Sequence, residues 1–200
     1  MLETIATQAE AVIAAIKANL PTVLTMVGVL YLIHIFNWFV GYRLNNLGII
    51  PRHARGLLGI VCAPFLHGNF NHLFFNSIPF VILTCLVLLN GWVAFIYVTV
   101  VVAVLGGLAT WLLARPGSHV GASGVIMGYW SYLLVNAYYQ PSWLSFVLAG
   151  VCVYYFGSFI FHIVPTSEKS SWESHFFGLL AGLFAAYSFP YFTVLVMKDF

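Results

Sequence analysis

Long apolar stretches without a charged side chain are the feature that most constrains the fold of this chain. One of them runs from Trp92 to Ala114 without an Asp, Glu, Lys or Arg. A helix needs about 20 residues to cross the hydrocarbon core of a bilayer, so this stretch is long enough. Only 6% of the 200 residues are charged, whereas a water-soluble domain carries about 25%. The sequence therefore predicts an integral membrane protein.

The apolar stretches divide into six predicted spans, which favour an all-α membrane protein folded as a six-transmembrane-helix bundle. Asn90-Gly91 marks a tight turn, and residues 165–173 are polar enough to be a loop. The spans are expected at residues 21–41, 72–89, 92–114, 121–139, 143–164 and 174–196. An even number of spans places both termini on one side of the membrane.

Two segments outside the spans are also expected to meet the membrane. Residues 1–20 are predicted to form an amphipathic interfacial helix, because apolar residues recur at helical spacing and Glu3, Glu10 and Lys17 are seven apart. The membrane domain would then occupy residues 21–200. The long first loop, residues 42–70, contains the apolar run LLGIVCAPFL. We expect this loop to be partly embedded in the membrane as short helices.

The composition predicts neither a nucleic-acid partner nor a metal or other cofactor. The net charge is only +2, and no cluster of Lys or Arg is present. The three cysteines, Cys62, Cys85 and Cys152, lie in apolar surroundings without CxxC spacing. They are therefore expected to be buried small side chains, not disulfide partners or zinc ligands. The lipid bilayer is the first partner that the sequence implies.

Polar side chains gather near the starts of the predicted second, fourth and sixth spans. These starts lie on the same side of the membrane, so their polar residues share one layer. Titratable residues at membrane depth are costly and indicate function by default. The residues of this layer are His67, His72, His119, His175, Asn76 and Ser123.

Glycines give two of the spans smooth faces that can approach closely. Taken alone, Ser123 is best explained as a packing residue between membrane helices. His175, however, precedes a glycine by three residues and so shares a helix face with it. Close packing of the two faces would bring the His175 ring to the Ser123 hydroxyl. The glycines concerned are Gly121, Gly124 and Gly128 in one span, and Gly178 and Gly182 in the other.

These residues suit nucleophilic catalysis. A neutral His175 can take the Ser123 proton during attack on a carbonyl and return it to the leaving amine. No Asp lies in any predicted span, so the pair would be a dyad. The oxyanion needs donors. His72 and Asn76, spaced i and i+4 on one helix face, and the backbone N–H of Ser123 can supply them.

Three motifs resemble the rhomboid intramembrane serine proteases over residues 21–196. They are HGNFNHLFFN at 67–76, GASG at 121–124 and SHFFGLLAG at 174–182. The resemblance implies that Ser123 is the nucleophile and His175 the general base and acid. It also implies that His72 and Asn76 line the oxyanion site and that His67 helps to hold the first loop. The implied reaction hydrolyses peptide bonds in or near transmembrane segments of membrane proteins, single-span substrates among them.

The resemblance also implies a multi-pass protein of the bacterial inner membrane with cytoplasmic termini and an active site open to the external side. The positive-inside rule taken alone gives the reverse orientation, because loop arginines concentrate on the side of the polar layer. Two positions depart from the family pattern. Leu58-Gly59 replaces a common Trp-Arg pair, and Met127 replaces an aromatic residue that packs on the catalytic histidine. Met127 is expected to orient His175 less firmly.

Three alternatives remain open at this stage. The first is a non-proteolytic rhomboid-like protein that binds client transmembrane helices, although such relatives typically lack the serine or the histidine. The second is a metal-dependent enzyme that uses the four histidines of the polar layer, although no HExxH motif or nearby carboxylate supports it. The third is a channel or transporter, although inverted repeats are absent.

Overall fold

The computed structural model describes residues 2–163 and 171–197, and in these ranges it is almost entirely helical. Five stretches are long and apolar enough to cross a membrane. A bundle of apolar membrane helices is therefore confirmed. The main helices are α1 (Leu2–Phe39), α3 (Phe70–Leu88), α4 (Trp92–Val101), α5 (Gly107–Leu113), α6 (Ser123–Tyr139), α7 (Trp143–Phe156) and α8 (Trp172–Met197). The π-helical turn η4 (Val102–Gly106) joins α4 to α5, and the 3₁₀ segment η5 (Gly157–Ile163) extends α7.

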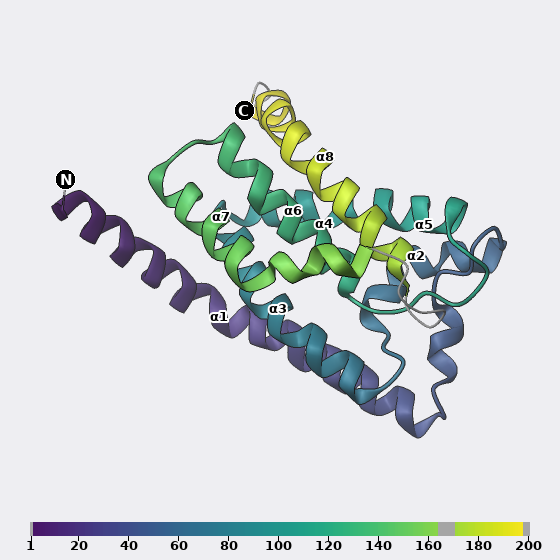
Figure 1. Ribbon diagram of the computed structural model, residues 1–200. Coiled ribbons are helices and arrows are strands. Elements are labelled where there is room, and N and C mark those ends of the chain that lie inside the picture. The colour runs from purple at the N-terminus through teal and green to yellow at the C-terminus, as the bar shows by residue number, and fades with distance from the viewer. Residues whose placement is uncertain (1, 164–170, 198–200) are drawn as a thin grey trace.

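Helix α6 lies inside the bundle with α7 and α8 on either side (Figure 1). It has only 17 residues, or about 25 Å of helix, and of the six predicted spans it is the one that is not among the five stretches long enough to cross a membrane. Most of its side chains are buried, including Tyr129 and Tyr132. Its most extensive contact is with α8. The residue that begins α6 is Ser123, so the central helix presents this serine at one end of the bundle.

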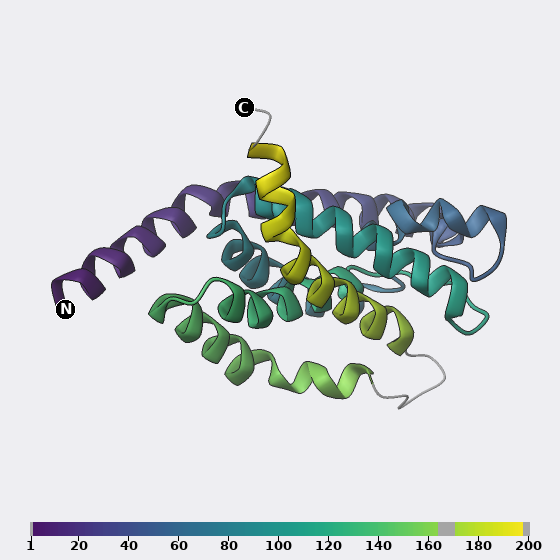
Figure 2. The same ribbon diagram turned by 90° about the horizontal axis from the view of Figure 1, so that it is seen from above.

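Helix α1 continues through Pro21 as one helix, so the proline expected to start the first span does not interrupt it. Proline removes the hydrogen bond to the carbonyl four residues earlier, here that of Lys17. Because Lys17 is exposed, polar surroundings can satisfy this carbonyl, and the helix need not end. Figure 2 shows the N-terminal half of α1 projecting beyond the other helices. The interfacial position of residues 1–20, and the boundary at residue 20, stay predictions.

The first loop folds into short helices, as its sequence predicts. They are η1 (Arg43–Leu47), η2 (Ala54–Leu57), α2 (Gly59–Cys62) and η3 (Ala63–Phe65). The Arg52 guanidinium donates to the carbonyls of Leu112 and Ala114 at the end of α5. The loop exposes Leu58 and Val61, side chains that suit contact with lipid. The first loop is therefore attached to the end of α5 through Arg52 and presents apolar side chains on its outer surface.

Glycine contacts set the distance between α6 and α8. A Cβ added to Gly178 would lie 2.1 Å from the carbonyl oxygen of Gly124, and one added to Gly182 would lie 2.1 Å from that of Gly128. A Cβ atom cannot occupy either position without moving a backbone. The two small-residue faces predicted from the sequence therefore meet directly.

We expect Gly178→Ala to lower the free energy of unfolding by about 1–3 kcal/mol, because the new methyl group must separate α6 from α8. Gly150→Ala in α7 is the matched control, since no atom of the described residues lies within 4 Å of its Cβ position. That substitution should raise stability by about 0.5–1 kcal/mol through helix propensity. Thermal unfolding in detergent measures both. Equal effects of the two substitutions would contradict the close contact.

Candidate active site

Ser123 is the first residue of α6, so its backbone N–H has no partner within the helix. The preceding Gly121 has φ +127°, a conformation that L side chains rarely adopt. A Cβ at Gly121 would also lie 2.8 Å from two ring atoms of His72. Gly121 thus makes the turn into α6 and lets the His72 ring approach the serine.

His175 lies in the first turn of α8, directly opposite Ser123. Its Nε2 is 2.8 Å from the Ser123 hydroxyl. A Cβ at Gly124 would lie 3.0 Å from the Ser174 carbonyl oxygen, so the helix starts are in contact as well. The structure therefore brings together the serine and histidine that the sequence singles out. The distance suits a hydrogen bond between a nucleophile and its base.

A cavity of about 230 Å³ opens beside this pair. Its wall includes His72 and Asn76, which occupy successive turns of α3 on the same face, together with Met127 of α6. The Asn76 Nδ2 is buried and has no hydrogen-bond partner among the described residues. A buried amide donor without a partner costs free energy, so it is a candidate for binding a ligand oxygen.

Phe159 of η5 lines the same cavity, a residue that the sequence did not single out. Its ring packs against Trp130 and Phe156. An aromatic side chain therefore borders the space beside His175, although position 127 of α6 holds a methionine. The tertiary contact of η5 with the bundle reveals it, because a phenylalanine in an apolar span does not by itself mark a site.

His67 supports the turn that carries Ser123. It is fully buried, and its Nε2 accepts a hydrogen bond from the backbone N–H of Ala122 at 3.5 Å. Burial, followed by the nearby rings of His72 and His34, lowers the pKa of His67 to about 3. The ring is therefore neutral at neutral pH and keeps the lone pair that this bond requires. Its contribution to stability is lost as the pH falls from about 6.5 toward 3.

A polar clamp, formed by Arg115, His119, Ser171 and Glu173, joins the loop before α6 to the start of α8. The Arg115 side chain donates to both carboxylate oxygens of Glu173, at 2.5 and 3.3 Å. The Glu173 side chain is 4% exposed and that of Arg115 44%. The His119 ring lies 2.5 Å from the Ser171 hydroxyl and 3.1 Å from the Arg115 carbonyl oxygen. The sequence places His119 in the polar layer, but the pairing of Arg115 with Glu173 was missed.

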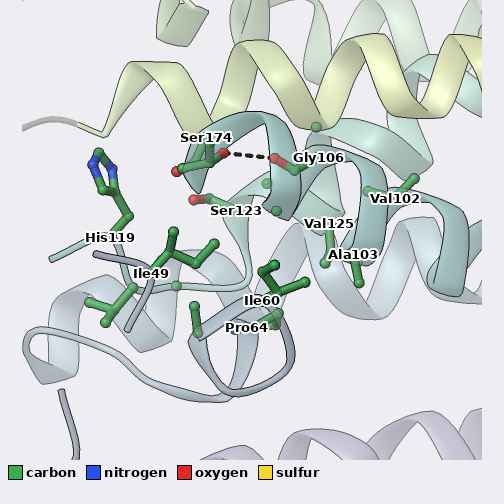
Figure 3. Close-up of a pocket in the computed structure, with 17 residues that line it drawn as sticks. Ile49, Ile60, Pro64, Val102, Ala103, Gly106, His119, Ser123, Val125 and Ser174 are labelled. Carbon is green, nitrogen blue, oxygen red and sulfur yellow. Dashed lines mark hydrogen bonds between the residues drawn. The ribbon is translucent and has the colours of Figure 1, made fainter. Parts of the chain in front are cut away.

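A second, smaller cavity of about 40 Å³ lies on the loop side of Ser123. Figure 3 shows Ser123 and Ser174 on one side of it, and Ile60 and Pro64 of the first loop on the other. This volume is sufficient for a water molecule. The serine thus borders two cavities, one toward His72 and Asn76 and one toward the first loop.

The histidines of the polar layer do not converge as metal ligands. Within residues 2–163 and 171–197, no group of three or more His, Cys, Asp or Glu side chains lies close enough to hold a metal ion. His175 faces Ser123, and His119 faces Ser171. The rings of His67 and His72 contact each other, with their centroids 5.1 Å apart.

Comparison with known proteins identifies the family. The Rhomboid domain profile matches residues 54–192. An uncharacterized protein from Mycobacterium tuberculosis is 37% identical over 175 residues, which cover 83% of this chain and 73% of the relative. One from Mycobacterium leprae is 34% identical over 176 residues, covering 83% of this chain and 69% of the relative. Because the profile spans more than half of the chain and these relatives align along most of it, this integral, multi-pass membrane protein belongs to the rhomboid family.

Proposed function

We propose that the protein is an intramembrane serine endopeptidase that uses a dyad of Ser123 and His175. The observation that carries this proposal is the 2.8 Å contact between the Ser123 hydroxyl and His175 Nε2 beside a cavity. The buried Asn76 Nδ2 on the cavity wall, which has no hydrogen-bond partner among the described residues, supports it. Membership of the rhomboid family, whose members are typically intramembrane serine proteases, supports it further.

The reaction proceeds in two stages. His175 Nε2 accepts the hydroxyl proton as the Ser123 oxygen attacks the scissile carbonyl, and the oxyanion receives hydrogen bonds from Asn76, His72 and the Ser123 N–H. Collapse breaks the C–N bond, and His175 passes its proton to the leaving amine. Water then attacks the acyl-enzyme with His175 as base, which releases the carboxylic acid and restores Ser123. The 40 Å³ cavity beside Ser123 can hold that water.

The substrates are transmembrane segments of other membrane proteins, single-span proteins included. A peptide bond inside a membrane helix has its carbonyl hydrogen-bonded within the helix. The segment must therefore unwind before its backbone can reach Ser123. A substrate that unwinds readily near the end of its span should be cleaved faster than a stable helix.

We further propose an orientation with cytoplasmic termini in a bacterial inner membrane and the active site open to the external side. Two of the loop arginines that argue against it by the positive-inside rule have structural partners. Arg52 binds the end of α5, and Arg115 binds Glu173. Their positions are explained by contacts within the protein, so they carry less weight as orientation signals. Lys169, also on that side, lies outside the described residues.

The decisive experiment offers a single-span reporter with Ala near its outer end to the purified protein. Cleavage should be lost in Ser123→Ala and in His175→Ala and should persist with a metal chelator. Ser131→Ala, a buried α6 hydroxyl bonded to backbone carbonyls, controls for loss of a packed serine. Cleavage by Ser123→Ala would refute the serine mechanism, and loss with chelator alone would favour a metal enzyme. Reporter binding without cleavage by the native protein would favour the client-binding alternative.

Asn76→Ala should lower kcat by about 10²–10³-fold with a smaller change in KM, because the amide donates to charge that develops in the transition state. Ser77→Ala is the neighbouring control, since its hydroxyl donates to the Leu73 carbonyl within α3. Steady-state cleavage of the reporter measures both variants. A kcat for Asn76→Ala near that of Ser77→Ala would exclude Asn76 from the oxyanion site.

The polar clamp predicts that removing Arg115 lowers stability more than removing Glu173 does. Arg115→Ala removes the charged partner of the buried Glu173 carboxylate, which keeps the hydrogen bond from the backbone N–H of residue 115, and should cost on the order of 3 kcal/mol of stability. Glu173→Ala leaves a guanidinium that is 44% exposed, so its cost should be about 1 kcal/mol. Both should lower kcat by loosening the start of α8, and the double variant should resemble Glu173→Ala. Arg55→Ala, an exposed loop arginine, is the control; strictly additive effects would argue against the clamp.

A further inference from the structure

A large apolar cavity lies between α1, the first loop, the α4–η4 segment and α6. Its volume is about 490 Å³, within the range of about 300–1,000 Å³ that small-molecule sites occupy. Its walls are aliphatic and aromatic except for Thr99 and Tyr129. It is separate from the cavity that holds Asn76 and His175, with which it shares no wall residue.

The two polar side chains of this cavity are satisfied within the protein. The hydroxyls of Thr99 and Tyr129 lie 2.7 Å apart, and Thr99 donates to the Phe95 carbonyl at 2.6 Å. A water molecule inside would need about two to four polar partners, which this wall does not offer. An occupant of the cavity is therefore apolar.

The cavity reaches the outer surface of the bundle. Val61, Val100 and Val104 contribute to its wall and are 68%, 54% and 40% exposed. Val100 belongs to one of the helical stretches that can cross the membrane, which extends from Trp92 to Leu113. At this depth the surroundings are lipid acyl chains. The chemistry available to enter the opening is thus a flexible alkyl chain.

We propose that an acyl chain of a bilayer phospholipid occupies this cavity as a bound ligand. The inner wall includes Ala122, which precedes Ser123, and Val125 in the first turn of α6. A chain seated there packs against the back of the serine-bearing turn, whose front faces His72. The lipid would then brace this turn from the side opposite the substrate. The binding site does not depend on the proposed protease activity.

Photo-crosslinking tests this site directly. The whole protein is reconstituted in phosphatidylcholine vesicles that contain a phosphatidylcholine with a diazirine near the middle of one acyl chain. Labelled peptides are then identified by mass spectrometry. We expect labelling concentrated on cavity residues such as Val100 and Val104 and on buried Ala122. Labelling spread evenly over exposed apolar residues, with none on Ala122, would mean surrounding lipid only and would overturn the proposal.

Matched pairs of variants sharpen the test. Val104→Trp places an indole in the cavity wall and should remove most of the Ala122 labelling. Leu105→Trp should not, because Leu105 is equally exposed, at 41%, but does not line the cavity. Val100→Trp in the cavity wall and Ile96→Trp outside it form a second pair. The native side chains at these two positions are 54% and 56% exposed. Equal labelling within both pairs would refute the site.

The same labelling on Ser123→Ala separates this proposal from the proposed function. The labelling of Ala122 should survive that substitution, because no cavity wall residue is changed. If the native protein is inactive but its Ala122 is still labelled by the lipid, the protease proposal alone is refuted. If the native protein cleaves the reporter but its Ala122 is not labelled, the lipid site alone is refuted.

Discussion

The contact of α6 with α8 through glycine is the constraint on which the rest of the structure depends. Gly178 approaches the Gly124 backbone so closely that no side chain fits between them. Helices normally pack with axes 8–10 Å apart, depending on the side chains at the contact, and glycine allows the closest approach. A His175 ring on one helix can then reach a Ser123 hydroxyl on the other. The proposed dyad is thus a consequence of backbone packing.

Polar contacts at the end of the bundle complete what the glycines begin. Glycine faces can slide along one another, so they do not fix the register of two helices. The polar clamp does, because the buried Glu173 carboxylate is stable only where Arg115 reaches it. His67 joins the first loop to the turn before α6 by accepting a hydrogen bond from the Ala122 backbone N–H. Helix packing sets the separation of Ser123 and His175, and the polar clamp sets the position of one helix along the other.

The sequence predicted those features that depend on local spacing. Apolar runs located the spans, and the interval from His175 to Gly178 placed the ring on the packing face of α8. The continuation of α1 through Pro21 was not foreseen. Whether a proline ends a helix depends on whether the carbonyl four residues earlier, here that of Lys17, finds another hydrogen-bond partner. The pairing of Arg115 with Glu173 was missed for a related reason. They are 58 residues apart, and no local pattern joins them.

Glu173 also bears on the absence of an aspartate from the proposed dyad. Its carboxylate lies only two residues from His175, which suggests a third catalytic member. Side chains at i and i+2 of a helix do not face each other, however, and both oxygens of Glu173 accept hydrogen bonds from Arg115. A carboxylate beside the imidazole would favour its protonated form. With Glu173 held by Arg115, that carboxylate is not available as a third member of the proposed dyad, and the described contact that orients the His175 ring is the one from its Nε2 to the Ser123 hydroxyl.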